Sequence, residues 1–155
     1  SLAHIKAGFA ASLGQLADAI SMPLDDFEVS GEVATARHDV AIDAGVIPAG
    51  TVAAQRITVA GMRNGRPLLI MRMNWYCSKD IDKDWELGAT GWRVQVEGDT
   101  PLDVTLRFPM PLEEFAATTP GYTAHRAVNA IAVVCAAAAG IRTTVDLPQV
   151  IAELG

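Results

Sequence analysis

Three polar side chains near the start of a predicted apolar helix could contact a ligand. His125 and Asn129 are four residues apart and Arg126 and Asn129 are three apart, so they lie on neighbouring parts of one helical surface. A helix N-terminus attracts anions such as a carboxylate. Two interpretations remain open: the three residues face a ligand, or they tie the helix to a sheet and to the preceding loop.

A second candidate site is aromatic. The polar stretch 78–91 contains Trp85 and is flanked by Trp75, Tyr76 and Trp92. An aromatic wall among acidic side chains can bind an amine through cation–π and ion-pair contacts, or the acids can simply form a solvated loop. These acids are Asp80, Asp82, Asp84 and Glu86. We predict Trp75 and Trp92 as core residues and Trp85, alone in a polar loop, as the binding candidate.

Common motifs of cofactor and metal chemistry are missing from the sequence. It contains no G-x-G-x-x-G phosphate loop, no G-x-S-x-G elbow and no H-E-x-x-H zinc motif. His4, His38 and His125 are far apart and lack carboxylates at metal-ligand spacing. We therefore name no catalytic residue, and we predict neither cofactor-binding residues nor metal ligands in this chain.

Composition narrows the class of protein further. A length of 155 residues suits one domain, and a net charge of −6 argues against nucleic-acid binding. No apolar run reaches the roughly 20 residues that a membrane helix needs. Cys77 and Cys135 lie in apolar runs, so we predict two buried thiols in a reducing, cytoplasmic compartment.

Hydrophobic periodicity predicts an α+β fold. A stripe of period three to four predicts a helix over residues 2–20, and a nearly all-round apolar segment predicts a buried helix over 123–139 that ends at Gly140. A last helical turn is expected from Pro148. Asn64-Gly65 predicts a type I′ hairpin turn. A period of two predicts five strands: one at 27–33 that continues through 37–42, and four more at 51–62, 67–77, 92–96 and 102–108. We expect a five-stranded sheet, mostly antiparallel or mixed, with helices on one face.

The predicted strand over residues 67–77 has two chemically different faces. Asn74 shares one face with Arg72 and Tyr76, and Trp75 shares the other with Met73. Clean alternation places one face on a core and the other in water or in a site. We include Asn74 among the candidate substrate-binding residues.

Two stretches resemble 2,4-diaminopentanoate dehydrogenase-like proteins. Residues 45–56 are similar to the pattern I-x-x-G-T-V-A-x-Q-R, and residues 127–148 resemble the ending VN-x-I/V, PGI-x-T, DLP. The spacing of Trp75 and Trp85 is also similar. Actinobacterial members of this family are often labelled dihydrodipicolinate reductase-like. The chain lacks the HHRHK and K-x-D-x-P-S-G-T-A segments of that reductase, so the reductase activity itself is not implied.

The resemblance implies the C-terminal domain of a two-domain dehydrogenase. Family members place an N-terminal Rossmann domain first, which binds NAD(P)H, so we expect residues 1–155 to be a single second domain without it. This domain would contact an amine or amino-acid substrate and form a homo-oligomer. His125, Arg126 and Asn129 would face the substrate carboxylate, and Trp85 its aliphatic part.

Three functions fit these observations. The first is the substrate-binding and dimerisation domain of an NAD(P)-dependent oxidoreductase that acts on an amine or amino acid. The second is a stand-alone, non-catalytic ligand-binding or oligomerisation module, which the missing cofactor motifs favour. The third is a small cofactor-free enzyme that uses His125. In each case we expect a small-molecule ligand, and neither nucleic acid nor a membrane as partner.

Overall fold

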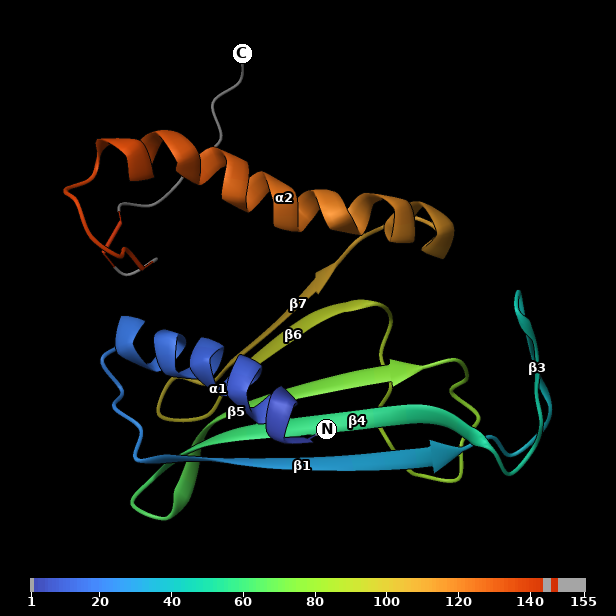
Figure 1. The fold of residues 1–155 in the computed structure, drawn as a ribbon. Coiled ribbons are helices and arrows are strands. Elements are labelled where there is room, and N and C mark those ends of the chain that lie inside the picture. The colour runs from blue at the N-terminus through green and yellow to red at the C-terminus, as the bar shows by residue number, and fades with distance from the viewer. Residues whose placement is uncertain (1, 144–145, 148–155) are drawn as a thin grey trace. The chain divides into compact units, whose positions relative to one another are not determined.

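A computed structural model describes residues 2–143 and 146–147. The described chain divides into two compact units, Ser1–Leu87 and Gly88–Gly155 (Figure 1). The fold is α+β and every described strand pairing is antiparallel, as predicted. The predicted turn at Pro148 lies outside the described residues.

A single five-stranded sheet is the wrong prediction. The described strands form a three-stranded sheet of order β1-β4-β5 and two separate two-stranded sheets, β2-β3 and β6-β7. Alternation shows which side chains share a face, but it does not specify which strand lies beside which. The division into three sheets was therefore not visible in the pattern.

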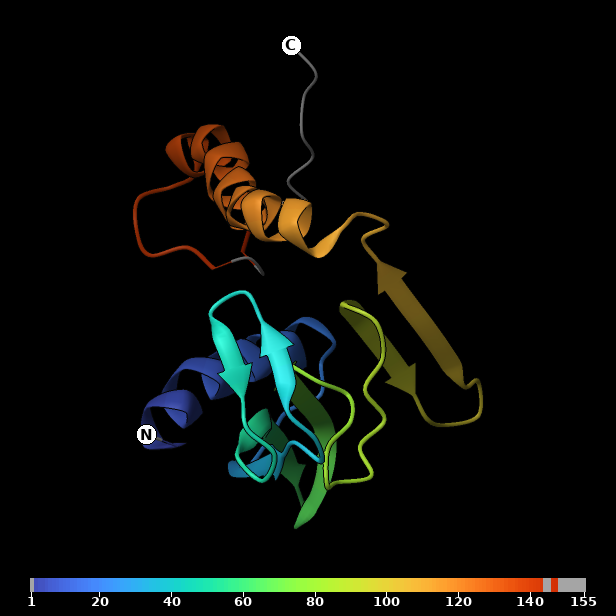
Figure 2. The same cartoon turned by 90° about the vertical axis from the view of Figure 1, so that its right-hand side faces the viewer.

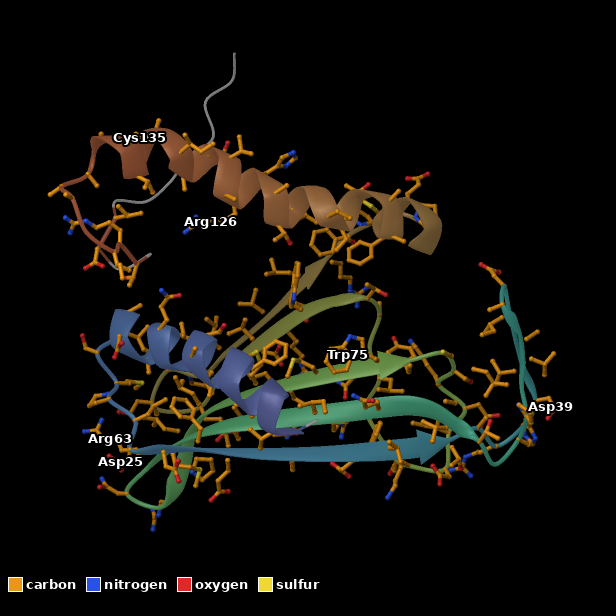
Figure 3. The ribbon with its side chains drawn as sticks, viewed as in Figure 1. Asp25, Asp39, Arg63, Trp75, Arg126 and Cys135 are labelled. Atoms are coloured by element: carbon orange, nitrogen blue, oxygen red, sulfur yellow. The ribbon has the colours of Figure 1, made fainter. Side chains whose placement is uncertain are left out.

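The three-stranded sheet is the framework of the first unit. It consists of β1 (Asp26–Thr35), β4 (Val52–Arg63) and β5 (Arg66–Tyr76). The β4–β5 turn is the predicted hairpin, because Asn64 and Gly65 both have positive φ, 52° and 71°. Asp25 lies at the same end of the sheet, where its Oδ2 accepts a 2.6 Å hydrogen bond from the Asn64 N–H (Figure 3).

Helix α1 (Leu2–Ala19) packs on one face of this sheet (Figure 1). Leu13 is buried against Ile57 and Val59, and partly buried side chains surround them. Leu16 and Ile20, which follow Leu13 at helical spacing, are about half exposed, whereas Ala17 is buried.

The end of α1 and its packing depend on short local contacts. Met22 N–H donates to the Ala17 carbonyl (2.8 Å) and Ser21 N–H to that of Asp18 (3.1 Å), with Ser21 at φ 56°. This is a Schellman motif, so the helix ends before Pro23 is reached. Leu24 packs closely over Gly61 on β4, since a Cβ there would stand 2.5 Å from Leu24 Cδ1 and the leucine side chain would have to shift.

A second hairpin and a covering segment complete the first unit. Strands β2 (Val40–Ile42) and β3 (Gly45–Ile47) pair in a ribbon of their own, where the sequence predicted one strand and a loop (Figure 2). The segment after β5, residues 78–87, is more than a solvated loop. Its Ile81 is buried and forms an isolated bridge with Ala36.

The second unit is a hairpin followed by a long helix. Strands β6 (Gly91–Val96) and β7 (Leu102–Arg107) pair in the predicted alternating register, and α2 spans Leu112–Ala136. The helix therefore begins well before the predicted Thr123 and ends before the predicted Gly140. Pro120 removes one backbone donor and its ring crowds a carbonyl of the preceding turn, yet the helix continues through it, and Thr119 Oγ1 donates to the Phe115 carbonyl at 2.5 Å.

Burial in the second unit differs from the prediction. No described residue there is buried, so α2 is not the buried helix that its apolar surface predicts. Trp92 is 56% exposed and Cys135 is exposed. In the first unit Trp75 is 51% exposed and Cys77 is also exposed. These predictions were wrong because an apolar pattern predicts burial only where another surface covers it.

A membrane-spanning helix must be both long and apolar. No helix in the described ranges is long and apolar enough to cross a membrane.

Candidate functional site

The sheet face opposite α1 carries a row of polar side chains. Because side chains alternate along a strand, Arg56 on β4 points away from the face on which Ile57 packs against α1. Its directly paired neighbours are Glu32 on β1 and Asn74 on β5. The pairing register therefore places a carboxylate, a guanidinium and an amide side by side.

Arg56 is held by two contacts. Its guanidinium carbon lies 4.4 Å from the centroid of the Trp85 ring, within cation–π range. Its Nε donates to Asn74 Oδ1 at 2.7 Å. The ring fixes the plane of the guanidinium and the amide fixes its edge, so the side chain is preorganised.

Trp85 is positioned by a small core at one end of this face. Ala34, Ala54 and Ile81 are buried there, and Tyr76 and Trp85 pack against them. The small alanine side chains leave room for residues 81–87 to lie close to the sheet. Trp85 is therefore part of a packed cluster rather than a residue of an open loop.

The charge environment of Arg56 is unbalanced. Burial lowers the pKa of Arg56, and the neighbouring positive charge of Arg72 lowers it further, while Glu32 acts in the opposite direction. Arginine still remains charged at any physiological pH. The guanidinium is thus a partly buried cation that an additional negative group would stabilise.

Two of the acids near Trp85, Asp80 and Asp82, have structural roles in the described chain. Asp82 Oδ1 accepts the Thr35 N–H at 2.8 Å, and this bond lowers the pKa of Asp82 below its usual value. Asp80 lies 3.7 Å from Arg37 Nε and 3.6 Å from His38 Nε2. These contacts attach the covering segment, residues 78–87, to the end of β1 and to the residues that follow it. The cation above Trp85 is the protein's own Arg56, where the sequence suggested a ligand amine.

The three predicted residues on α2 lie in the second unit. His125, Arg126 and Asn129 are all exposed (Figure 3 labels Arg126). Because α2 begins at Leu112, they lie in the middle of the helix, and the attraction of a helix N-terminus for anions does not act on them. The His125 ring lies over Gly121, whose added Cβ would be 3.6 Å from His125 Cε1.

Another surface of the second unit is a shallow hollow at the end of α2. It is lined by apolar side chains that include Val133 and Leu147, together with Arg142 and Asp146. Both polar residues are engaged locally: Arg142 donates to the Ala138 carbonyl (3.0 and 2.7 Å) and Asp146 accepts from Thr143. Within the described ranges no three acidic, histidine or cysteine side chains are grouped as metal ligands.

Of the predicted residues, the structure brings Trp85 and Asn74 together, because both contact Arg56. Sequence reasoning missed Arg56, although the residue ends the Q-R stretch on which the family resemblance rested. The signal available was a cation on the strand face opposite the apolar residues Ile57 and Val59. The alternation of side chains along strands could not predict the position of Trp85, because Trp85 lies in the segment 78–87, outside the named helices and strands.

The described chain is an α+β fold of antiparallel sheets, with a polar and aromatic cluster around Arg56 on the sheet face opposite α1. The chain belongs to the family of the 2,4-diaminopentanoate dehydrogenase C-terminal domain, whose profile matches residues 2–155. The resemblance inferred from the sequence is confirmed, and the chain is an oxidoreductase domain. The comparisons found no matching curated protein and no matching solved structure.

Proposed function

We propose that this chain is the substrate-binding and dimerisation domain of an NAD(P)-dependent oxidoreductase that acts on an amine or amino acid. The family is named for 2,4-diaminopentanoate, which is both an amine and an amino acid. The observation that carries the proposal is the cluster in which Trp85 and Asn74 hold the partly buried guanidinium of Arg56. A rigid charged group beside an aromatic ring orients a small ligand, because little rotamer freedom remains to be lost on binding.

Each unit carries its own set of candidate substrate contacts. In the first unit, we propose that Trp85 packs against the aliphatic part of the substrate and that Asn74 supplies an amide next to Arg56. In the second unit, His125, Arg126 and Asn129 form a separate, alternative set of candidate contacts. Their exposure on α2 is compatible with contact to a ligand.

We assign NAD(P)H binding to a different domain. A dinucleotide site requires a parallel βαβ unit with a glycine-rich turn at a helix N-terminus. The described strands pair antiparallel, and the connection from β7 to α2 passes through Pro109 and Pro111 without a glycine. The described residues therefore do not fit that group, and we assign them no step that involves it.

Dimerisation is supported by the surface of the second unit. The cross-strand pairs Trp92–Leu106, Val94–Val104 and Val96–Leu102 form an apolar face on the β6–β7 hairpin, and each of these side chains is at least 36% exposed. Isolated two-stranded hairpins are at best marginally stable in water. A second copy of the protein would cover such a face. The same apolar face of the β6–β7 hairpin also supports the alternative function, a stand-alone non-catalytic module.

The substrate-binding role can be tested by comparing two tryptophans in the full-length enzyme. Trp85→Ala should lower kcat/KM for 2,4-diaminopentanoate by about tenfold, mainly through KM, which corresponds to about 1.4 kcal/mol. Trp75→Ala is the matched control, because Trp75 lies on the opposite face of β5 and is half exposed (Figure 3). An equal loss in both variants, or no loss in Trp85→Ala, would contradict the role.

A further inference from the structure

The open sheet face carries charges that the proposed function does not yet use. Glu32, Arg56 and Asn74 form one directly paired row, and Ser30, Thr58 and Arg72 form the next row on the same face. Glu32 and Arg72 are both exposed. The structure records no ion pair for either of them with another described residue, although both act electrostatically on Arg56.

The spacing of these charges is set by the sheet itself. Directly opposed Cβ atoms on antiparallel strands are about 5 Å apart and diagonal neighbours about 7–8 Å apart. Arg56 therefore has a carboxylate directly beside it on one strand and a second guanidinium diagonally across on the other. A ligand that matches this pattern carries a negative and a positive group a few ångströms apart.

The orientation of Arg56 leaves its binding edge available. Asn74 occupies Nε and Trp85 covers a face of the guanidinium, while the structure records no hydrogen bond from the two terminal nitrogens to a described residue. Arginine uses such nitrogens for paired hydrogen bonds to a carboxylate. Glu32 in the same row disfavours a dianion such as phosphate and favours an ammonium.

We propose that Arg56, assisted by Arg72, binds the carboxylate of an amino-acid substrate and that Glu32 binds its ammonium group. This inference rests on the proposed function and narrows it, because the site selects an amino acid over a simple amine. It also places the carboxylate on the sheet face rather than on Arg126 of α2.

The test compares two ligands that differ by one carboxylate. The full-length protein is titrated calorimetrically with 2,4-diaminopentanoate and with 1,3-diaminobutane, which keeps both amines and lacks the carboxylate; turnover of both is measured in parallel. Arg56→Gln should weaken binding of the amino acid by at least about 30-fold and change binding of the diamine by less than about threefold. Glu32→Gln should weaken binding of both ligands, since both carry ammonium groups.

Three further variants keep the result interpretable. Arg56→Lys retains the charge and loses the paired geometry, so it should lose part of the amino-acid affinity even if Arg56→Gln folds poorly. Arg66→Gln, at the exposed start of β5, is the matched control and should behave as the wild type. Arg126→Gln tests the rival position for the carboxylate and should leave the ratio of the two affinities unchanged.

The outcomes separate the inference from the proposed function. Wild-type protein that binds the amino acid through Arg56 but catalyses no NAD(P)-dependent reaction would uphold the inference and contradict the proposed function. Active enzyme in which Arg56→Gln affects both ligands equally, or in which Arg126→Gln removes the preference for the carboxylate, would overturn the inference. Wild-type protein that binds neither ligand would also overturn it.

Discussion

The two units of this domain bury their apolar side chains to very different extents. In the first unit, two clusters of buried residues lie on the two faces of one sheet, one around Val59 and one around Ala34. In the second unit no described residue is buried, and large apolar side chains such as Val128 and Ile131 are 59% exposed. The first unit can therefore fold on its own contacts, whereas the second requires another surface.

The two units also differ in the kind of contact that positions their side chains. In the second unit, aromatic rings form one cluster: Phe108 lies 4.9 Å from Trp92, 5.2 Å from Phe115 and 5.0 Å from Tyr122, measured between ring centroids. In the first unit the polar cluster stands on a packed sheet. A binding site needs its side chains held rigidly by the elements beneath them, so the first unit is the better support for one.

The largest expected effect comes from separating the units. A fragment of residues 1–87 should unfold cooperatively on heating, while a fragment of residues 88–155 should show no cooperative transition as a monomer. Circular dichroism melts and hydrogen exchange of both fragments check this. A sharp, concentration-independent melt of the second fragment would contradict the claim that the second unit requires another surface in order to fold.

Single substitutions of apolar residues should show the same contrast on a smaller scale. Leu13→Ala, in the core between α1 and the sheet, should lower the free energy of unfolding by about 2–5 kcal/mol. Ile131→Ala, on the exposed side of α2, should change it by less than about 0.5 kcal/mol and should instead weaken self-association. Denaturant titration and light scattering of both variants distinguish the two effects.

A pH titration tests the attachment of the covering segment. The Asp82 carboxylate accepts the Thr35 N–H, and its pKa is lowered below the usual 3.8. A lowered native pKa contributes stability that is present above the unfolded pKa and lost as the pH falls through the native value. The stability difference between wild type and Asp82→Asn should therefore be constant at neutral pH and vanish in strong acid. A difference that grows on acidification would contradict this assignment.

The smallest effect is expected at the ion pair of the second hairpin. Arg93 Nη2 lies 2.5 Å from Asp103 Oδ2, and both side chains are about half exposed. Exposed ion pairs contribute little and are screened by salt. Asp103→Asn should leave the melting temperature nearly unchanged, and any difference should disappear at 1 M salt. A large, salt-independent loss would show that the pair is covered by another surface.

Much of the local structure could be predicted from the sequence. The alternating strands of the three-stranded sheet, the Asn64-Gly65 turn and the first helix follow from local patterns that depend on few residues. Helix α2 was predicted too short because Pro120 resembles a boundary, yet one missing donor does not stop a helix whose neighbouring turns remain bonded. The division into sheets depends on strand neighbours, which alternation does not encode.

The candidate site was only half predictable for a related reason. Trp85 and Asn74 were identified by residue type and position, but the residue that joins them, Arg56, becomes evident only when β4 is paired between β1 and β5. The fold also showed that two of the acids near Trp85, Asp80 and Asp82, bind the protein's own backbone and side chains. Tertiary contacts of this kind have no signature in a single sequence.

The most direct test of the central claim is a crystal structure of the full-length protein with 2,4-diaminopentanoate bound. We expect the substrate carboxylate about 3 Å from the terminal nitrogens of Arg56, with Trp85 beside it and Glu32 facing the ammonium group. A carboxylate bound to Arg126 on α2, with the sheet face around Arg56 empty, would contradict it.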